Sequence, residues 1–136
     1  MKSESMFQNP VTIGVDIEDV ARFSRRPFAE HERLYRRLFT GDEIAYCNAQ
    51  RRPALHYTAR FSVKEAAIKA LVPYGRFSFR DFEVRKSGSG APFLAIVHTV
   101  PGRPVPAALQ VSLSHCDAYA VAMVIALGTP DAAAAL

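Results

Sequence analysis

Residues 59–71, ARFSVKEAAIKAL, have the composition of a helix that is apolar around most of its circumference, yet they include one carboxylate and three cations. At about 100° per residue, Thr58, Ser62, Glu65 and Lys69 fall on one narrow polar stripe of this helix. Apolar residues flank the stripe on both sides. A polar stripe between two apolar faces predicts a helix that packs against two neighbours and opens its polar side into a cleft.

A strand and two helices are predicted before this helix. Residues 11–18, VTIGVDIE, alternate apolar with polar or small side chains, which is the period of a strand with one buried face. Asp16 lies on the polar face near the end of this strand. The Arg-rich stretch 20–39 is broadly amphipathic, and Pro27 divides it into two helices.

Local signals define the start and the end of the next helices. Thr40 with Glu43 three residues later forms a capping box, which predicts a short helix through Cys47. Pro53 suits the first turn of the long helix, which we expect to reach about Val72.

The second half of the chain predicts two hairpins. The strands of the first hairpin, FEVRK (82–86) and PFLAIV (92–97), are joined by the turn SGSG. The strands of the second, LQVSLSH (109–115) and YAVAMVIAL (119–127), are apolar on both faces, which predicts a central position in a sheet. The fold class is therefore α+β, with a small antiparallel sheet packed with helices and one long central helix.

Length and composition limit the function classes. The chain has 136 residues, 49% hydrophobic and 22% charged, which predicts one globular domain at 11–128 with an N-terminal extension at 1–10 and a flexible tail at 129–136. We expect a cytoplasmic protein with no membrane partner, since no apolar run approaches the roughly 20 residues of a membrane span and the first residues lack a secretory signal. The spacing of Cys47 and Cys116 predicts two reduced thiols.

Charge indicates an anionic partner without identifying it. The net charge is +4, and six arginines occur as the pairs Arg25/Arg26, Arg36/Arg37 and Arg51/Arg52. Each pair taken alone is equally consistent with a solvated surface. Nucleic acid, an acidic protein and a phosphate-rich small molecule would all suit such pairs.

The polar residues of the strand and the long helix suggest a metal that holds phosphate. Mg²⁺ is bound by one or two carboxylates together with substrate phosphate oxygens, so Asp16 with Glu65 would be a sufficient protein contribution. Lysine and arginine would neutralise the remaining phosphate charge. Taken alone, Glu65 and Lys69 are best explained as a surface i,i+4 ion pair worth roughly a few tenths of a kcal/mol.

The order of these motifs is more specific than any one of them. IGVDI followed about 45 residues later by RFSVKEAAIK resembles the signature of phosphopantetheinyl transferases of the holo-[acyl-carrier-protein] synthase type. LFTGDE, FSFRDFEVRKSGSGAPFL and VSLSHCDAYAVAMV fall in the same order and spacing. The resemblance implies the phosphopantetheinyl transferase fold and transfer of phosphopantetheine from coenzyme A to a serine of an apo acyl carrier protein, releasing adenosine 3',5'-bisphosphate.

The resemblance also implies residue roles. Asp16 and Glu65 correspond to the magnesium ligands, and Lys69 corresponds to the lysine that contacts the transferred phosphate. The general base stays open between Glu65 and a metal-bound water. Residues that correspond to coenzyme-binding positions are Arg51, Arg52, Arg60, Lys64 and His115. Residues assigned to the acidic carrier protein are Arg22, Arg25 and Arg26, with Arg33 and Arg37 as a possible extension of the patch. The loop LVPYGR departs from the family, which has a glycine-rich loop there.

Two other functions would suit parts of this sequence. A nonenzymatic nucleic-acid-binding module would use the arginine pairs but has no need of Asp16 or Glu65, and the chain lacks an aromatic-rich RNA motif. We therefore expect no nucleic acid as partner. A magnesium-dependent hydrolase of a nucleotide diphosphate would suit the carboxylates but not the order of the motifs along the whole chain.

The long helix and the second hairpin also bear on assembly. A helix with apolar residues on both sides needs two apolar neighbours, and a chain this short has few elements that could cover both faces of a sheet. The resemblance to the family implies the number of subunits, since members of this size are similar to one another in forming trimers with active sites between subunits. We therefore expect a homotrimer in which Asp16 and Glu65 of one chain face Arg51 and Arg52 of the next.

Overall fold

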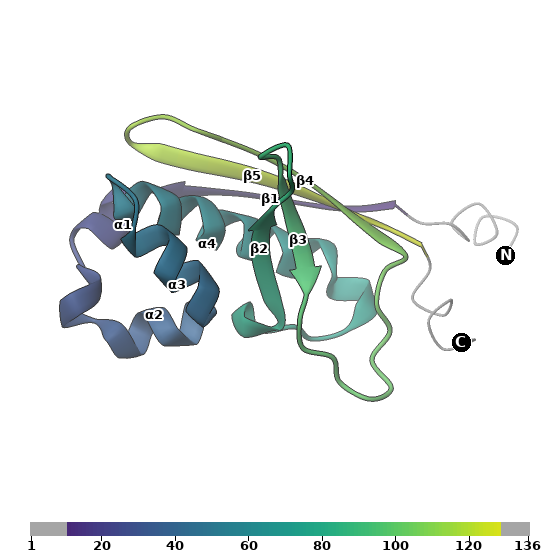
Figure 1. The fold of residues 1–136 in the computed structure, drawn as a ribbon. Coiled ribbons are helices and arrows are strands. Elements are labelled where there is room, and N and C mark those ends of the chain that lie inside the picture. The colour runs from purple at the N-terminus through teal and green to yellow at the C-terminus, as the bar shows by residue number, and fades with distance from the viewer. Residues whose placement is uncertain (1–10, 129–136) are drawn as a thin grey trace, which may run out of the picture.

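A three-stranded antiparallel sheet runs along one side of the long helix α4 in the computed structural model, which describes residues 11–128 (Figure 1). The strand order is β1-β5-β4, with β1 at Val11–Asp19, β5 at Tyr119–Leu127 and β4 at Ala108–His115. The predicted strands are all present, and β5 is central as expected, whereas β4 is an edge strand. The predicted extension 1–10 and tail 129–136 lie outside the described residues.

Helix α4 spans Pro53–Ala70, and Pro53 occupies its first turn as predicted. Proline suits this position because the first-turn N–H groups have no partner within a helix. The helix ends two residues before the expected Val72, and a single 3₁₀ turn, η3 at Val72–Tyr74, follows it. Within the described residues, no helix is both long and apolar enough to cross a membrane.

The short helices gather at one end of α4 (Figure 1). Glu43 N–H donates to Thr40 Oγ1 at 3.3 Å and Thr40 N–H donates to Glu43 Oε1 at 2.8 Å, so the predicted capping box is confirmed. Earlier in the chain, Pro27 separates the first short helix from the helical turns that follow it, as expected. These elements are α1 (Ala21–Ser24), the 3₁₀ turn η2 (Phe28–Glu30), α2 (Glu32–Leu38) and α3 (Gly41–Asn48).

A separate two-stranded sheet stands beside α4 (Figure 1). Its strands are β2 (Phe82–Lys86) and β3 (Pro92–Ile96), preceded by the 3₁₀ turn η4 (Phe79–Asp81). The long connection from β3 to β4 is fastened by Arg103, whose Nη1 lies 3.2 Å from Asp81 Oδ2. This hairpin gives α4 a further neighbour besides the sheet.

The prediction that α4 packs on two sides is confirmed. One side, including Val63 and Ala66, is buried in a cluster with β5 and β2. Another side places Tyr57 and Phe61 among the aromatic side chains of the short helices. Burial of apolar area stabilises the folded chain by about 25 cal/mol per Å². Both contacts are therefore stabilising, and α4 is the element that the two clusters share.

Strand β1 turns its apolar residues away from α4. The side chains of Val11, Ile13, Val15 and Ile17 are all more than half exposed. On β5, Tyr119, Val121 and Met123 are also exposed large hydrophobic residues. One face of the three-stranded sheet is therefore an uncovered apolar surface in the single chain.

Gly14 explains why the opposite face of β1 fits closely on α4. A Cβ atom built at Gly14 would lie 1.9 Å from the carbonyl oxygen of Ala66 and 2.8 Å from the backbone nitrogen of Ala70. Nothing larger than glycine fits, since both contacts are with backbone atoms. The backbones of the strand and the helix are consequently in direct contact at Gly14, two residues before Asp16.

Candidate active site

Asp16 and Lys69 meet where β1 crosses α4. Lys69 Nζ lies 3.3 Å from Asp16 Oδ1 and donates a hydrogen bond to the Val15 carbonyl at 3.0 Å. Ser62 Oγ donates to the Asp16 carbonyl at 2.9 Å. The polar stripe of α4 is thus partly used to attach the strand, and Thr58, fully buried, bonds back to Ala54 of its own helix. Only the Glu65–Lys69 part of the stripe reaches the surface.

Glu65 lies beside this pair and is half buried. Burial, followed by the negative charge of Asp16, raises the pKa of the Glu65 carboxyl, while Lys69 and Arg22 act against this rise. Asp16 Oδ2 is buried and has no hydrogen-bond partner within the described residues. The site therefore holds carboxylates that lack sufficient positive charge of their own.

Glu18 belongs to the same cluster and was missed as a site residue. Burial, followed by the neighbouring Asp16 carboxyl, raises the pKa of Glu18 to about 7. Arg22 Nη1 lies 3.1 Å from Glu18 Oε2 at the edge of the cluster. The signal was available, because residues two apart on a strand share one face.

This donor set fits a hard divalent cation. Crowded carboxylates with raised pKa values and a buried, unpartnered carboxylate oxygen would be relieved by a bound cation. Among residues 11–128, no group of three or more His, Cys, Asp or Glu side chains is arranged to hold a metal ion. The remaining ligands would therefore have to be substrate oxygens and waters, which is the usual way that Mg²⁺ is bound.

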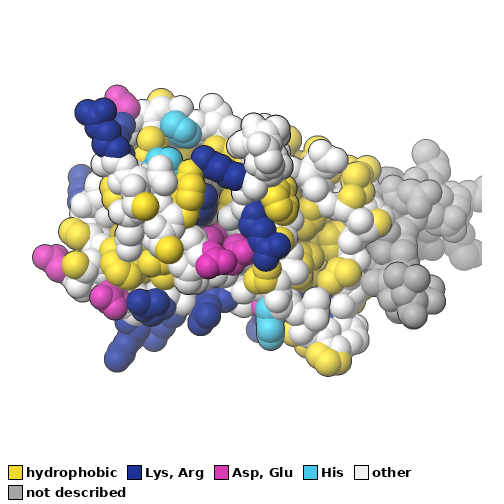
Figure 2. All heavy atoms as spheres, in the orientation of Figure 1, with side chains coloured by type: hydrophobic (Ala, Val, Ile, Leu, Met, Phe, Trp, Pro, Cys, Tyr) yellow, Lys and Arg dark blue, Asp and Glu magenta, His cyan; other side chains and the backbone are white. Residues whose placement is uncertain are grey.

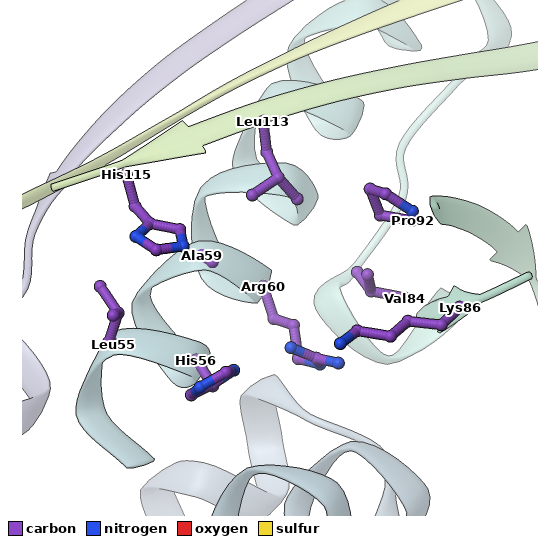
Figure 3. Close-up of a pocket in the computed structure, with 9 residues that line it drawn as sticks. All are labelled: Leu55, His56, Ala59, Arg60, Val84, Lys86, Pro92, Leu113 and His115. Carbon is purple, nitrogen blue, oxygen red and sulfur yellow. The ribbon is translucent and has the colours of Figure 1, made fainter. Parts of the chain in front are cut away.

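Arg60 and His115 line one pocket on a different side of α4 (Figure 3). The pocket has a volume of about 170 Å³. Arg60 is buried, its Cζ lies 4.2 Å from the centre of the Tyr46 ring, and its Nε has no hydrogen-bond partner within the described residues. The two predicted coenzyme-binding residues are thus close together but apart from the Asp16 carboxylates.

Lys64 requires a correction. Its side chain is fully buried, and Nζ lies 2.5 Å from Glu43 Oε1 and 2.9 Å from the Leu38 carbonyl. The carboxylate of Glu43 also accepts the backbone N–H of Val84. A cation enclosed in this way has no free donor surface for a coenzyme phosphate, so Lys64 joins α4 to its neighbours instead.

The remaining predicted residues lie on the surface. Arg51 is exposed, and Arg52 Nη1 lies 2.8 Å from Asp117 Oδ1 in the turn between β4 and β5. In the carrier-protein set, Arg22 lies over the Phe61 ring at 4.8 Å, and Arg25 and Arg26 are exposed after α1. In the single chain, the Arg51/Arg52 pair is not part of the Asp16 cluster.

Exposed basic side chains also appear in several groups over one face of the molecule, with acidic side chains between them (Figure 2). Lining residues of a second pocket, of about 180 Å³, include Arg22, Arg26 and Phe61. A hollow that combines basic rims with apolar walls suits an acidic protein that also inserts an apolar side chain.

The chain is similar over most of its length to proteins of one known family. A profile described as the 4'-phosphopantetheinyl transferase superfamily matches residues 12–124. The holo-[acyl-carrier-protein] synthase of Moorella thermoacetica is 41% identical over 118 residues, covering 82% of this chain and 90% of the relative. That of Anaeromyxobacter sp. is 40% identical over 123 residues, covering 86% and 95%.

A solved structure is also similar. The holo-(acyl-carrier-protein) synthase of Bacillus anthracis, in complex with CoA (3',5'-ADP), has a TM-score of 0.69 and is 26% identical. The alignment covers 87% of this chain and 96% of that one. The similarity therefore extends over nearly all of both chains.

Proposed function

We propose that Asp16, Glu65 and Lys69 carry out the reaction of this chain, which belongs to the 4'-phosphopantetheinyl transferase superfamily. The chain is a holo-[acyl-carrier-protein] synthase: it transfers the phosphopantetheine arm of coenzyme A to an apo acyl carrier protein. The observation that carries the site proposal is the buried, unpartnered Oδ2 of Asp16 next to Glu65 and Lys69.

We assign the magnesium ion to Asp16 and Glu65. When bound, the ion would supply charge neutralisation to the diphosphate of coenzyme A. We assign to Lys69 the contact with the phosphate that is transferred, which is supported by a side chain that is about half exposed beside Asp16. Arg60 and His115 remain the proposed contacts for other phosphates and for the nucleotide end of the coenzyme.

The chemistry needs few groups from this chain. The serine oxygen of the carrier protein forms a new bond to the phosphorus of the phosphopantetheine phosphate, and the bond from that phosphorus to adenosine 3',5'-bisphosphate breaks. We assign the serine proton to the carboxylate of Glu65, which lies near Asp16 and Lys69. Phosphoryl transfer depends chiefly on positioning and charge neutralisation, so no nucleophile of this chain is required.

Transfer is tested by mass spectrometry. The full chain, coenzyme A, a divalent metal and a panel of apo carrier proteins should yield a carrier that has gained one phosphopantetheine, and no product without metal. Asp16→Ala and Glu65→Ala should each abolish the gain while circular dichroism stays unchanged. Hydrolysis of coenzyme A across the panel with no modified carrier would contradict the transferase, and activity in either variant would contradict the metal assignment.

We assign the carrier protein to Arg22, Arg25 and Arg26. Arg22→Glu should raise KM for the carrier much more than KM for coenzyme A, because the contact is with the acidic partner. Added salt should act in the same direction, since charges are screened over roughly 8 Å at physiological ionic strength. Equal effects on both substrates would indicate that Arg22 serves the coenzyme or the fold.

We also propose a homotrimer with shared active sites. The exposed apolar face of β1 and β5 supports it, because an uncovered apolar sheet face is typical of a surface buried by a partner. Mixing Asp16→Ala chains with Arg52→Glu chains should restore part of the activity, since some mixed sites carry neither change. A fully active monomer by light scattering, or no rescue despite subunit exchange, would overturn the shared site.

A cytoplasmic location completes the proposal. Cys47 and Cys116 are both free thiols, as expected from their spacing, and free thiols suit a reducing compartment. Cell fractionation with an antibody to the full chain would test the location, and recovery in an oxidising compartment would contradict it.

A further inference from the structure

The ammonium group of Lys69 contacts strand β1 at two points. Its Nζ donates a hydrogen bond to the Val15 carbonyl at 3.0 Å and lies 3.3 Å from Asp16 Oδ1. An ammonium has three donors, which rotate to suit their acceptors. Lys69 therefore uses one donor on the backbone of the strand and another on the carboxylate that we assign to the metal.

Asp16 offers a cation little surface besides the oxygen that Lys69 contacts. The Asp16 side chain is 10% exposed, and its Oδ2 is buried. Both oxygens belong to one small carboxylate group, so a cation bound to either of them comes close to Lys69 Nζ. The ammonium and a divalent cation would therefore repel each other at this position.

The charge of Lys69 also acts on Glu65. Burial and the negative charge of Asp16 raise the pKa of Glu65, and the positive charge of Lys69 opposes that rise more than the charge of Arg22 does. Arg22 is itself paired with Glu18, at 3.1 Å from Nη1 to Oε2. Lys69 is thus the main cation that balances both carboxylates assigned to the metal.

The Lys69 side chain has room to turn away from Asp16. It is about half exposed, and a lysine has a long stem with several rotatable bonds. Its hydrogen bond to the Val15 carbonyl does not depend on Asp16, and the strand is kept near the helix by the backbone contact at Gly14. Lys69 can therefore exchange the carboxylate for another anion and keep its bond to the strand.

We propose that Lys69 and the divalent cation compete for Asp16: Lys69 is the counter-ion of this carboxylate until the cation binds, and it then turns to the phosphate of the coenzyme. The inference rests on the proposed function for the metal ligands and for the phosphate contact of Lys69. A phosphate that accepts Lys69 removes the repulsion that the metal meets at Asp16. Metal and coenzyme therefore strengthen each other's binding through the position of one side chain.

The competition is tested by titrating the full chain with Mn²⁺ in the absence of coenzyme and measuring the free ion by electron paramagnetic resonance. Lys69→Met should bind Mn²⁺ at least about fivefold more tightly than wild type, since two unit charges about 4 Å apart interact by that much even in bulk water. Lys69→Arg keeps the charge and should show no such gain. Weaker or unchanged binding by Lys69→Met would overturn the proposal.

Arg33→Met is the control for net charge, because it removes an exposed cation on α2. Its affinity for Mn²⁺ should match that of wild type. A gain equal to that of Lys69→Met would mean that the overall charge of the chain, and not competition at Asp16, explains the effect, and it would overturn the proposal.

Asp16→Asn shows where the ion binds. This variant keeps the shape of the side chain and removes its charge, so it should lose most of the Mn²⁺ binding while circular dichroism stays unchanged. Added to Lys69→Met, it should also remove the gain in affinity. A gain that persists in the double variant, or no binding of Mn²⁺ by wild type and Lys69→Met alike, would overturn the proposal.

Coenzyme A provides the test of where Lys69 goes. The titrations are repeated with saturating coenzyme A and corrected for the Mn²⁺ that coenzyme A binds without protein. Coenzyme A should raise the Mn²⁺ affinity of wild type at least about fivefold more than that of Lys69→Met, because only wild type has an ammonium that can move from Asp16 to the phosphate. An equal increase in both chains would overturn the move to the phosphate.

The outcomes separate this competition from the proposed function, because none of the titrations contains a carrier protein. If no carrier is modified but Lys69→Met binds Mn²⁺ more tightly, the proposed function fails and the competition at Asp16 stands. If a carrier is modified but Lys69→Met shows no gain, the competition is wrong and the proposed function stands.

Discussion

Lys64 and Lys69 stand five residues apart on the same helix, and each pairs with one carboxylate. The Lys64 and Glu43 side chains are 0% and 1% exposed, and their atoms lie 2.5 Å apart. The Lys69 side chain is 53% exposed, and its atoms lie 3.3 Å from Asp16. The two lysines point about 140° apart around α4, one into the chain and one toward a cluster of carboxylates.

The difference shows how one residue type is enclosed as a structural cation in one place and stays accessible in another. Lys64 donates to Glu43 and to the Leu38 carbonyl and is fully buried, so it is fixed in the folded chain. Lys69 keeps exposed surface and faces a carboxylate that is incompletely paired. Only the second arrangement leaves a cation free to meet a substrate.

The largest effect should come from removing the buried cation. Lys64→Met leaves the Glu43 carboxylate buried without its cation, which should cost about 3–5 kcal/mol of unfolding free energy. Urea denaturation followed by circular dichroism measures it. A loss within about 0.5 kcal/mol would mean that Lys64 is not structural and would reopen its coenzyme role.

Removing the exposed cation should affect activity instead. Lys69→Met should reduce the rate of transfer about 10²- to 10³-fold, as expected for one lost group that stabilises transition-state charge. The urea midpoint should stay near that of wild type, because exposed ion pairs contribute little to stability. Loss of stability comparable to Lys64→Met would erase the distinction between the two lysines.

A third pair, Asp81 with Arg103, lies between these extremes of exposure. Burial opposes ionisation of Asp81, but hydrogen bonds from Ser78 N–H, His98 and Arg103 outweigh it and lower the pKa of Asp81. Because the folded pKa is below the unfolded value of 3.8, this stability is present above that pH and is lost as pH falls through the folded pKa. Asp81→Asn should cost about 1–3 kcal/mol at pH 6.

The control for Asp81 is pH itself. The stability difference between wild type and Asp81→Asn, measured by urea denaturation, should shrink from pH 6 to pH 3. A constant difference over that range would show that the hydrogen bonds and not the charge are responsible.

The smallest expected effect is a partial rescue. Glu43→Gln added to Lys64→Met removes the unpaired charge and keeps one acceptor oxygen, which can serve either the Val84 or the Thr40 N–H group but not both. The double variant should recover about 1 kcal/mol relative to Lys64→Met alone, determined by a double-mutant cycle. Additive losses would show that the two side chains are not energetically coupled.

Local signals made much of the fold predictable. Thr40 with Glu43, Pro27 and Pro53 each act within a few residues, so their structural effect follows from their immediate neighbours. Asp16, Glu65 and Lys69 were also brought together as the family resemblance implies. That agreement depended on matching motifs over the whole chain and not on spacing alone.

Tertiary contacts account for what was missed. A helical wheel gives the direction of Lys64 but not the position of Glu43, which lies 21 residues earlier and reaches it only in the folded chain. Likewise, alternation along β1 predicts two faces without showing which one meets α4. Gly14 decides this, because only its face can approach the helix backbone so closely.

Because Gly14 has no side chain, β1 and α4, which carry the carboxylates, lie in direct backbone contact at this position. Asp16 belongs to the strand and Glu65 to the helix, so the gap between their side chains depends on how near the two backbones come. A side chain at position 14 would push β1 away from α4 and so increase the distance from Asp16 to both Glu65 and Lys69. The distance between the proposed site residues is therefore set at a position that carries no side chain.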